Sequence, residues 1–156
     1  MKHEVVFLSR MNPPTVPVAV VMERLKLNDR WQTEKWEAVG VLAFSPEQEV
    51  RTLLRDATRE QMLYPGLEIK LYRDECEGYL ANLTGAHPKV FVAWRLEEEI
   101  AKPWFVTVSY NEAARLMDGG EQVDGVPMPA EIAAWMAPFA EANYRPPPEK
   151  IRRKKW

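Results

Sequence analysis

The sequence has 156 residues, which fits one domain, because single domains usually have about 100–200 residues. Hydrophobic residues make up 46% and charged residues 28%, the values of a globular protein, so wholesale disorder is excluded. A single cysteine, Cys76, excludes an intramolecular disulfide, and no apolar run approaches the ~20 residues of a membrane helix. The N-terminal apolar run, residues 5–8, is too short for a signal peptide, and we expect a soluble, cytoplasmic protein.

The first half of the chain predicts a flexible lead, two strands and a helix. Residues 1–15 form the lead. Nearly continuous apolarity over 16–22 predicts a central strand buried on both faces, and 36–44 predicts a second one. Residues 45–48 have the sequence of a capping box, and the apolar spacing after them predicts a helix over roughly 46–59.

The second half alternates short helices and strands. Residues 67–72 predict a half-solvated strand, and a short helix carrying Cys76 on its apolar stripe ends at Gly85. Ser109 opens a second helix with a capping box, and Pro138 is expected to kink the last helix or cut it short. Two further strands are predicted over 90–96 and 104–109.

This order lacks the regular alternation of a doubly wound parallel sheet. We therefore expect an α+β fold: a mainly antiparallel sheet of about five strands, three to four short helices and an extended basic C-terminal tail. The expected division is the lead over 1–15, a single α+β domain over 16–144, and a proline-rich spacer with the tail over 145–156.

No catalytic or metal-binding motif stands out. Cys76 reads as a buried structural thiol, while His3 and His87 have no nearby partner in the sequence and read as surface histidines. There is no glycine-rich phosphate loop, and the acidic run 97–99 lacks the alternating spacing of a calcium loop. It reads as a solvated loop or as a receiver for the basic tail. We expect no enzyme activity, no cofactor and no bound metal.

Charge is distributed unevenly along the chain. Residues 145–156 hold six basic residues and one acidic residue, a net charge of +5, whereas residues 1–144 carry −7. The three prolines at 146–148 predict an extended spacer that projects the basic end. The tail is either a solvating terminus, a segment lying on its own acidic body, or a docking element. We expect docking, through Arg152, Arg153, Lys154, Lys155 and the terminal aromatic anchor Trp156.

Trp31, Arg24 and Met128 form a weaker second candidate patch. Trp31 lies in a turn before the second strand and is a candidate exposed anchor, whereas Trp36 reads as a core residue. Together with Arg24, the two tryptophans could stack on bases, but the negative body argues against nucleic acid. Met128 lies between two prolines and either sets the path into the last helix or contributes an adaptable contact.

Several segments together resemble an uncharacterised proteobacterial family of small domains of unknown function. The resemblance covers about residues 16–156 and is carried by residues 17–24, Trp31, 36–42, 77–83, 120–121, 126–129, Trp135 and 150–155. Members of that family are encoded beside molybdenum-containing formate dehydrogenases and their maturation proteins. The resemblance implies an accessory role in assembling that enzyme, with a formate dehydrogenase subunit or maturation factor as the protein partner. It implies no catalytic residues.

Three hypotheses follow from the sequence. The favoured one is a non-enzymatic module that binds a protein partner and helps to assemble a redox enzyme. The second is a binder of nucleic acid or of an anionic surface through the basic tail. The third is a small enzyme or cofactor-binding protein, with a pocket lined by Glu23, Arg24, Tyr79 and Asn82.

Overall fold

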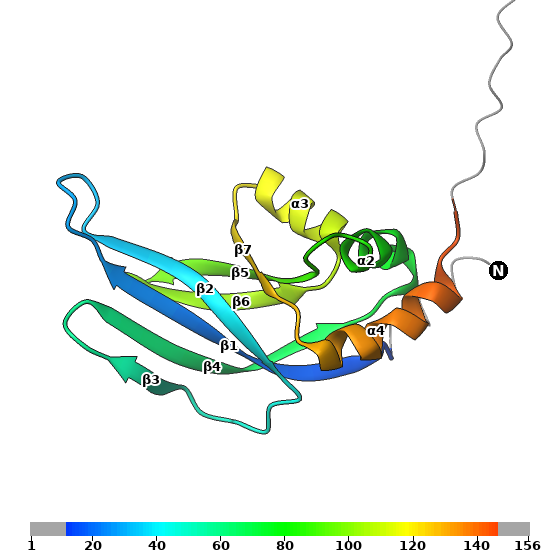
Figure 1. Cartoon of the computed structure of the whole chain (residues 1–156), viewed down its shortest axis with the longest axis horizontal. Helices are drawn as coiled ribbons and strands as arrows, with labels where there is room; N and C mark the ends of the chain where they lie inside the picture. The colour runs from blue at the N-terminus through cyan, green and yellow to red at the C-terminus, as the bar shows by residue number, and fades with distance from the viewer. Residues whose placement is uncertain (1–11, 147–156) are drawn as a thin grey trace, which may run out of the picture.

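The computed structural model describes residues 12–146, and their elements form two antiparallel sheets and three α-helices (Figure 1). The expected α+β class is therefore confirmed. The strands are β1 (Thr15–Lys26), β2 (Glu34–Ala43), β3 (Arg51–Arg55), β4 (Arg59–Lys70), β5 (Lys89–Glu97), β6 (Ile100–Thr107) and β7 (Gln122–Pro127). The helices are a 3-10 turn, η1 (Arg73–Glu75), and α2 (Cys76–Leu83), α3 (Tyr110–Asp118) and α4 (Ala130–Asn143).

The expectation of a single sheet of about five strands is wrong. The strands divide into a four-stranded sheet, in the order β2-β1-β4-β3, and a three-stranded sheet, in the order β6-β5-β7. The core fills the space between the sheets and beneath helices α2 and α4. Val16, Val18, Val20 and Met22 of β1 are all fully or almost fully buried in it, as the apolar run of that strand predicts.

The predicted helix over 46–59 is wrong. Residues 51–55 form strand β3, which pairs with β4 and contains a bulge between Thr52 and Leu54. The Ser45 side chain accepts a hydrogen bond from the Glu47 N–H at 3.3 Å, so the apparent capping box closes a local turn and opens no helix. The connection through residues 44–50 carries the chain from β2, at one edge of the first sheet, to β3 at the other edge.

The other predicted helices are present. Cys76 is buried at the start of α2, and the Ser109 side chain caps α3 by accepting from the Glu112 N–H at 3.1 Å. Helix α4 runs through Pro138 to Asn143, so the expectation that this proline cuts the helix short is wrong. Strand β7 was not expected from the sequence.

A buried polar cluster holds α2 against α3. The Glu75 carboxylate accepts a hydrogen bond from Ser109 Oγ at 2.6 Å and forms a short ion pair with Arg115. Gly78 of α2 lies directly against Ser109, and a Cβ placed on Gly78 would come within 2.1 Å of Ser109 Oγ. The close approach of the two helices therefore requires glycine at this position.

Asp124 connects the two sheets. Its carboxylate, on β7, accepts hydrogen bonds from the Ala38 N–H of β2 at 2.9 Å and from Trp94 Nε1 of β5 at 2.8 Å. Ala38 lies beside the bulge of the β1–β2 ladder, between Val21 and Met22. One side chain thus satisfies a backbone donor that leaves the regular ladder and ties the edges β2 and β7 together.

Candidate functional site

The principal candidate residues Arg152, Arg153, Lys154, Lys155 and Trp156 lie outside the described residues. Docking through this tail stays a prediction. The described chain leaves α4 at the end of the molecule that also carries α2, whereas the β1–β2 loop lies at the opposite end (Figure 1).

Trp31 lies in the β1–β2 loop, and its side chain is 88% exposed. Asp29 Oδ1 accepts a hydrogen bond from the Trp31 N–H at 2.9 Å, which fixes the turn that presents the indole. Trp36, by contrast, is half-buried and packs against the core, as expected. An indole that contacts so little of its own chain is available as an anchor for another molecule.

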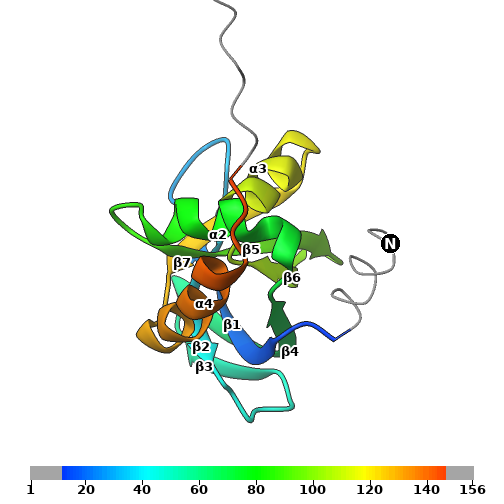
Figure 2. The same ribbon diagram turned by 90° about the vertical axis from the view of Figure 1, so that its right-hand side faces the viewer.

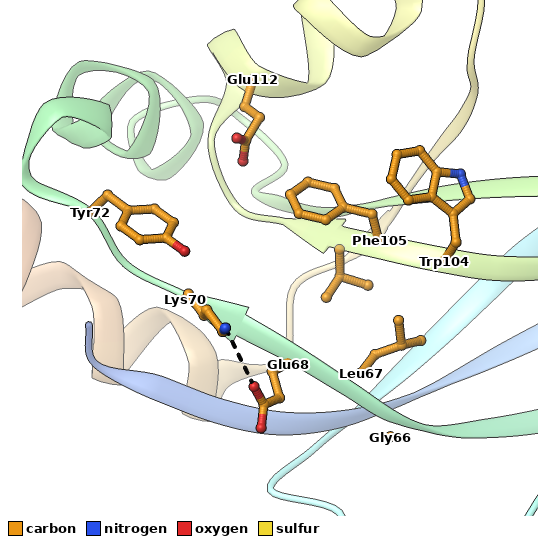
Figure 3. Close-up of a pocket in the computed structure, with 9 residues that line it drawn as sticks. Gly66, Leu67, Glu68, Lys70, Tyr72, Trp104, Phe105 and Glu112 are labelled. Atoms are coloured by element: carbon orange, nitrogen blue, oxygen red, sulfur yellow. Dashed lines mark ion pairs between the residues drawn. The ribbon is translucent and has the colours of Figure 1, made fainter. Parts of the chain in front are cut away.

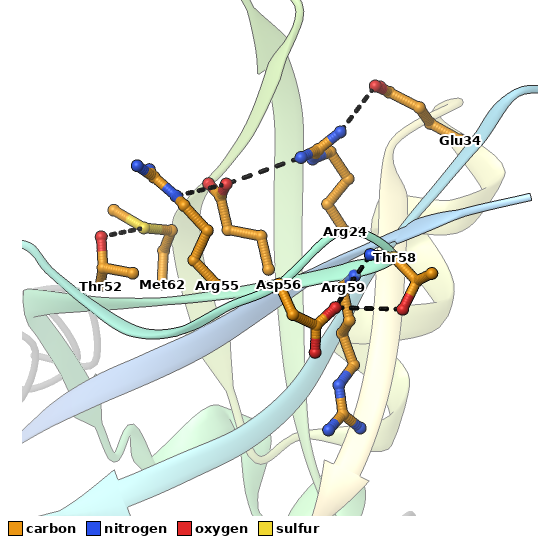
Figure 4. A network of polar contacts seen from close by, with 9 residues as sticks. Arg24, Glu34, Thr52, Arg55, Asp56, Thr58, Arg59 and Met62 are labelled. Carbon is orange, nitrogen blue, oxygen red and sulfur yellow. Dashed lines mark hydrogen bonds and ion pairs between the residues drawn. The ribbon is translucent and has the colours of Figure 1, made fainter.

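Arg24 is held by its neighbours. Its guanidinium forms ion pairs with Glu34 at 3.0 Å and with Glu60 at 3.6 Å, and Glu60 also pairs with Arg55 at 3.1 Å (Figure 4). Arg24, Glu34 and Glu60, with residues of the β5–β6 turn, border an acidic groove of about 300 Å³. Arg24 therefore neutralises neighbouring carboxylates, which leaves little positive charge there to offer a partner.

Met128 does not join Arg24 and Trp31 in one patch. It lies between β7 and α4, is half-buried against the core, and its N–H donates to the Pro88 carbonyl at 3.0 Å. The start of α4 is far from the β1–β2 loop in Figure 1. This position fits the first alternative, in which Met128 sets the path into the last helix, and a contact of Met128 with a partner stays a prediction.

The pocket considered for an enzyme, with Glu23, Arg24, Tyr79 and Asn82, is not formed by the described residues. Tyr79 is 1% exposed in the core, and the Asn82 amide is buried and bonded to backbone groups of two other segments. Glu23, by contrast, lies on β1 of the four-stranded sheet, where it accepts a hydrogen bond from Gln61 Nε2 at 3.0 Å. Tyr79 and Asn82 therefore serve packing and backbone hydrogen bonding.

A cleft that the sequence did not predict lies between β4 and β6 (Figure 3). Its volume is about 280 Å³. Leu67 of β4 and Trp104, Phe105 and Val106 of β6 supply apolar lining, and Trp104 is 38% exposed. The rim carries charge, with Glu112 at one side and a 3.8 Å ion pair between Lys70 and Glu68 at the other. The remaining lining residues are Gly66 and Tyr72.

The cleft exists because the two sheets do not join there. Strand β3 pairs with β4 only as far as Leu63, so the same edge of β4 has no strand partner over 64–70 within the described chain. Strand β6 pairs only with β5 among the described strands. Each of these strands contains a proline, Pro65 in β4 and Pro103 in β6, and prolines within sheets are confined to edge strands and irregularities.

The Trp104 side chain, which lines the cleft, contacts Arg95 and Phe105. The Arg95 guanidinium lies 4.0 Å from the centroid of the Trp104 ring, and Trp104 and Phe105 have ring centroids 5.6 Å apart. The Glu121 carboxylate accepts two hydrogen bonds from the Arg95 guanidinium, of 3.1 and 2.5 Å. This contact lowers the pKa of the Glu121 carboxyl and raises the pKa of Arg95. A cation held in place over the indole restricts the orientation of the Trp104 ring.

Large apolar side chains are also exposed near the two opposite edges of the four-stranded sheet, at the end of β2 and around β3. In the ladders of β1, Leu42 lies opposite Ala19, and Gly40 and Leu63 lie on either side of Val21. At the β2 end and around β3, four large side chains are between 42% and 53% exposed: Leu42, Phe44, Val50 and Leu53. We call these four residues the outer apolar patch.

Within residues 12–146 no three His, Cys, Asp or Glu side chains are grouped so that they could hold a metal ion. None of the helices in this range has the length and apolarity needed to cross a membrane.

Comparison with known proteins identifies a family. No curated protein and no solved structure matches the chain. One family model does, over residues 17–155, and it describes a protein of unknown function, as the sequence resemblance led us to expect. A match over nearly the whole chain shows that this protein belongs to the family described as "Protein of unknown function (DUF3305)".

Proposed function

We propose that this protein is a non-enzymatic accessory protein that binds a protein partner in the cytoplasm during maturation of a molybdenum-containing formate dehydrogenase. The enzyme is suggested by the sequence resemblance, whose family members are encoded beside it. Partner binding is supported by one observation above all, the outer apolar patch.

The outer apolar patch supports a protein interface because four large apolar side chains near the ends of one sheet are between 42% and 53% exposed. The patch has charged neighbours, since Arg51 and Glu47 form an ion pair of 3.2 Å beside Val50. An apolar centre with a polar rim is the usual anatomy of an interface.

The basic tail adds a second contribution to this mechanism. Its charge of +5 would attract an acidic partner surface and accelerate encounter, an effect that salt screens. Trp156 and the outer apolar patch would then slow dissociation through apolar contact. Removal of residues 150–156 should leave the domain folded and weaken partner capture, most clearly at low salt.

The test combines a gene deletion with affinity capture in the native host. We expect the deletion strain to lose most formate dehydrogenase activity, and wild-type protein to restore the activity and to capture a subunit or maturation factor. Leu42→Lys with Phe44→Lys should capture several-fold less. Met117→Lys is the matched control, because Met117 is similarly exposed, at 49%, on a different surface, α3.

Two results would contradict the proposal. One is full formate dehydrogenase activity in the deletion strain. The other is equal capture by wild type, by the Leu42→Lys/Phe44→Lys variant and by the truncated chain. A gel shift with nucleic acid at about 150 mM salt, lost on truncation, would instead support binding of an anionic polymer through the tail.

A further inference from the structure

The lining of the β4–β6 cleft is mostly apolar and aromatic. Leu67 of β4 and Phe105 and Val106 of β6 line it, together with Trp104, whose side chain is 38% exposed. In Figure 2, β6 and the end of β4 lie on the side of the molecule away from α4, and no residue of α4 is among the lining residues. Within the described chain the cleft is therefore open to another molecule.

Glu112, in the first turn of α3, adds a charge to this cleft. In Figure 3 its carboxylate points toward the other lining residues, and within residues 12–146 it forms no hydrogen bond and no ion pair. A glutamate at this position of a capping box usually accepts from the N-cap N–H, but here the Ser109 N–H donates to Thr107 Oγ1 at 3.0 Å. The Glu112 carboxylate is thus available to a ligand.

The charge that Glu112 brings is not balanced by the rest of the lining. Lys70 and Glu68 form an ion pair of 3.8 Å, so the lining as a whole is negative by the charge of Glu112. A carboxylate beside aromatic rings attracts a cation. The flat guanidinium of arginine can both stack on a ring and form two parallel hydrogen bonds with a carboxylate, which the ammonium of lysine cannot do. The charge and the lining therefore match an arginine side chain.

The size of the cleft and its borders favour an arginine that belongs to a peptide. Its volume of about 280 Å³ is below the range of about 300–1,000 Å³ that is typical of small-molecule pockets. The edge of β4 over 64–70 has no strand partner within residues 12–146, and residues 66–70 contain no proline. Backbone groups along such an edge form hydrogen bonds readily with an added extended segment.

We propose that the β4–β6 cleft binds an arginine side chain that an extended segment of a protein partner inserts. The guanidinium pairs with Glu112, and the methylene groups lie against Phe105 and Val106. The backbone of the segment forms hydrogen bonds with the edge of β4 over 66–70. This inference rests on the proposed function, because the occupant is a protein partner, and it adds the chemistry that the cleft selects.

The first test is a titration of the isolated full chain with two peptides, followed by NMR. One peptide is acetyl-Val-Thr-Arg-Val-Thr amide, and the other has citrulline, the neutral isostere, in place of arginine. We expect the arginine peptide to shift the indole N–H signal of Trp104 and the amide signals of residues 66–70, and to leave the indole signal of Trp31 unchanged. The citrulline peptide should bind about tenfold more weakly, because the charge-assisted hydrogen bonds are lost. Equal affinity for the two peptides, or no shift at Trp104, would overturn the proposal.

The second test changes the carboxylate. Glu112→Gln keeps the shape of the side chain, and it should weaken binding of the arginine peptide about tenfold while leaving the affinity for the citrulline peptide unchanged. An equal loss for both peptides would show a structural role of Glu112 and contradict its pairing with the guanidinium.

Glu98→Gln is the matched control, since Glu98 is an exposed carboxylate that borders the acidic groove. It should bind the arginine peptide as wild type does. Weaker binding in Glu98→Gln, with full binding in Glu112→Gln, would assign the arginine to the acidic groove and overturn its place in the cleft.

Agmatine distinguishes a free guanidinium from one carried by a peptide. It should shift the Trp104 signal only at about tenfold higher concentration than the peptide, because it has no backbone to bond to β4. Binding of agmatine as tight as that of the peptide would overturn the role of the strand edge.

All these titrations use the isolated chain, so a negative result leaves the gene deletion and the affinity capture unaffected. Conversely, peptide binding as expected, together with full formate dehydrogenase activity in the deletion strain, would contradict only the proposed function.

Discussion

Gly78 decides how closely α2 and α3 can pack. Alanine at most helix positions is more stable than glycine by roughly 0.5–1 kcal/mol, but here the added Cβ would meet Ser109 Oγ at 2.1 Å. Ser109 is fully buried and holds both Glu75 and the first turn of α3, so it cannot move without breaking those hydrogen bonds.

We therefore expect Gly78→Ala to lower the free energy of unfolding by about 1–3 kcal/mol, the usual cost of overpacking. Urea denaturation measures it. Ala81→Gly, at an exposed position of the same helix, is the control and should cost only the propensity difference. A Gly78→Ala variant as stable as wild type would contradict the packing described for the two helices.

Ionisation of the buried Tyr79 hydroxyl makes the free energy of unfolding depend on pH in the alkaline range. Burial raises the pKa of its hydroxyl above the ordinary value of 10.0, although the hydrogen bond from the Tyr72 N–H, at 2.8 Å, acts in the opposite direction. Because the folded pKa is raised, the contribution of Tyr79 is complete below the unfolded pKa and is lost as the pH rises above it.

The free energy of unfolding should therefore fall as the pH rises above about 10, and Tyr79→Phe should make this fall less steep. Some slope remains, because burial also raises the pKa of Cys76 and of Tyr64. Tyr110→Phe is the control, because it removes the same hydroxyl from a side chain that is 57% exposed. If the free energy of unfolding of Tyr79→Phe falls with pH as steeply as that of wild type, a group other than Tyr79 causes the fall.

At the scale of single elements, Pro138 is an internal weakness of α4. The helix continues for five residues beyond it, although proline has no N–H to bond the carbonyl of residue 134. Pro138 lies on the exposed side of the helix, whereas Ile132, Met136 and Ala140 are buried. Its ring is therefore not part of the core.

We expect Pro138→Ala to raise the free energy of unfolding by about 1–3 kcal/mol, since alanine restores the donor and has the higher helix propensity. Glu141→Ala, one turn further on the exposed side, should change it by less than about 0.5 kcal/mol. A loss of stability in Pro138→Ala would mean that packing of α4 depends on the local geometry that the proline imposes.

The elements that could be predicted are those whose apolar pattern has one interpretation. The run over 16–22 allows only a buried strand, and the Ser109 capping box opens a real helix. Val50, Leu53 and Leu54 have helical spacing, yet they belong to a strand or its approach, because the β-bulge after Thr52 interrupts the alternation of β3. Strand β7 was missed because Asp124, Gly125 and Pro127 are residues that strands usually avoid.

At the scale of the whole molecule, Asp124 carries the connection between the sheets. Asp124→Ala would leave the Ala38 N–H and Trp94 Nε1 without their acceptor, and hydrogen bonds to a charged group contribute about 1.5–3 kcal/mol. We expect a loss of about 2–4 kcal/mol in the free energy of unfolding, measured by urea denaturation.

Asp118→Ala is the control for this substitution, because Asp118 is an exposed carboxylate at the end of α3. Asp124→Asn should recover part of the loss, since its amide oxygen still accepts. Equal stability of Asp124→Ala and wild type would show that the sheets are held together by apolar packing alone.

The candidate sites could be predicted only in part from the sequence, because each is assembled from segments far apart in the chain. The exposure of Trp31 follows from its turn. The β4–β6 cleft does not, since it depends on two strands that belong to different sheets. Pro65 and Pro103 were the available signal, because a proline within a strand indicates an edge.

The crossing from β2 to β3 has a consequence for folding kinetics. The β1–β4 ladder joins residues 15–25 to residues 59–70, so its formation closes a loop that contains the whole of β2 and β3. Loop-closure entropy must be overcome before such distant contacts stabilise the chain. Refolding should therefore take milliseconds to seconds, as in other proteins of high contact order, with the β5–β6 hairpin forming ahead of the first sheet.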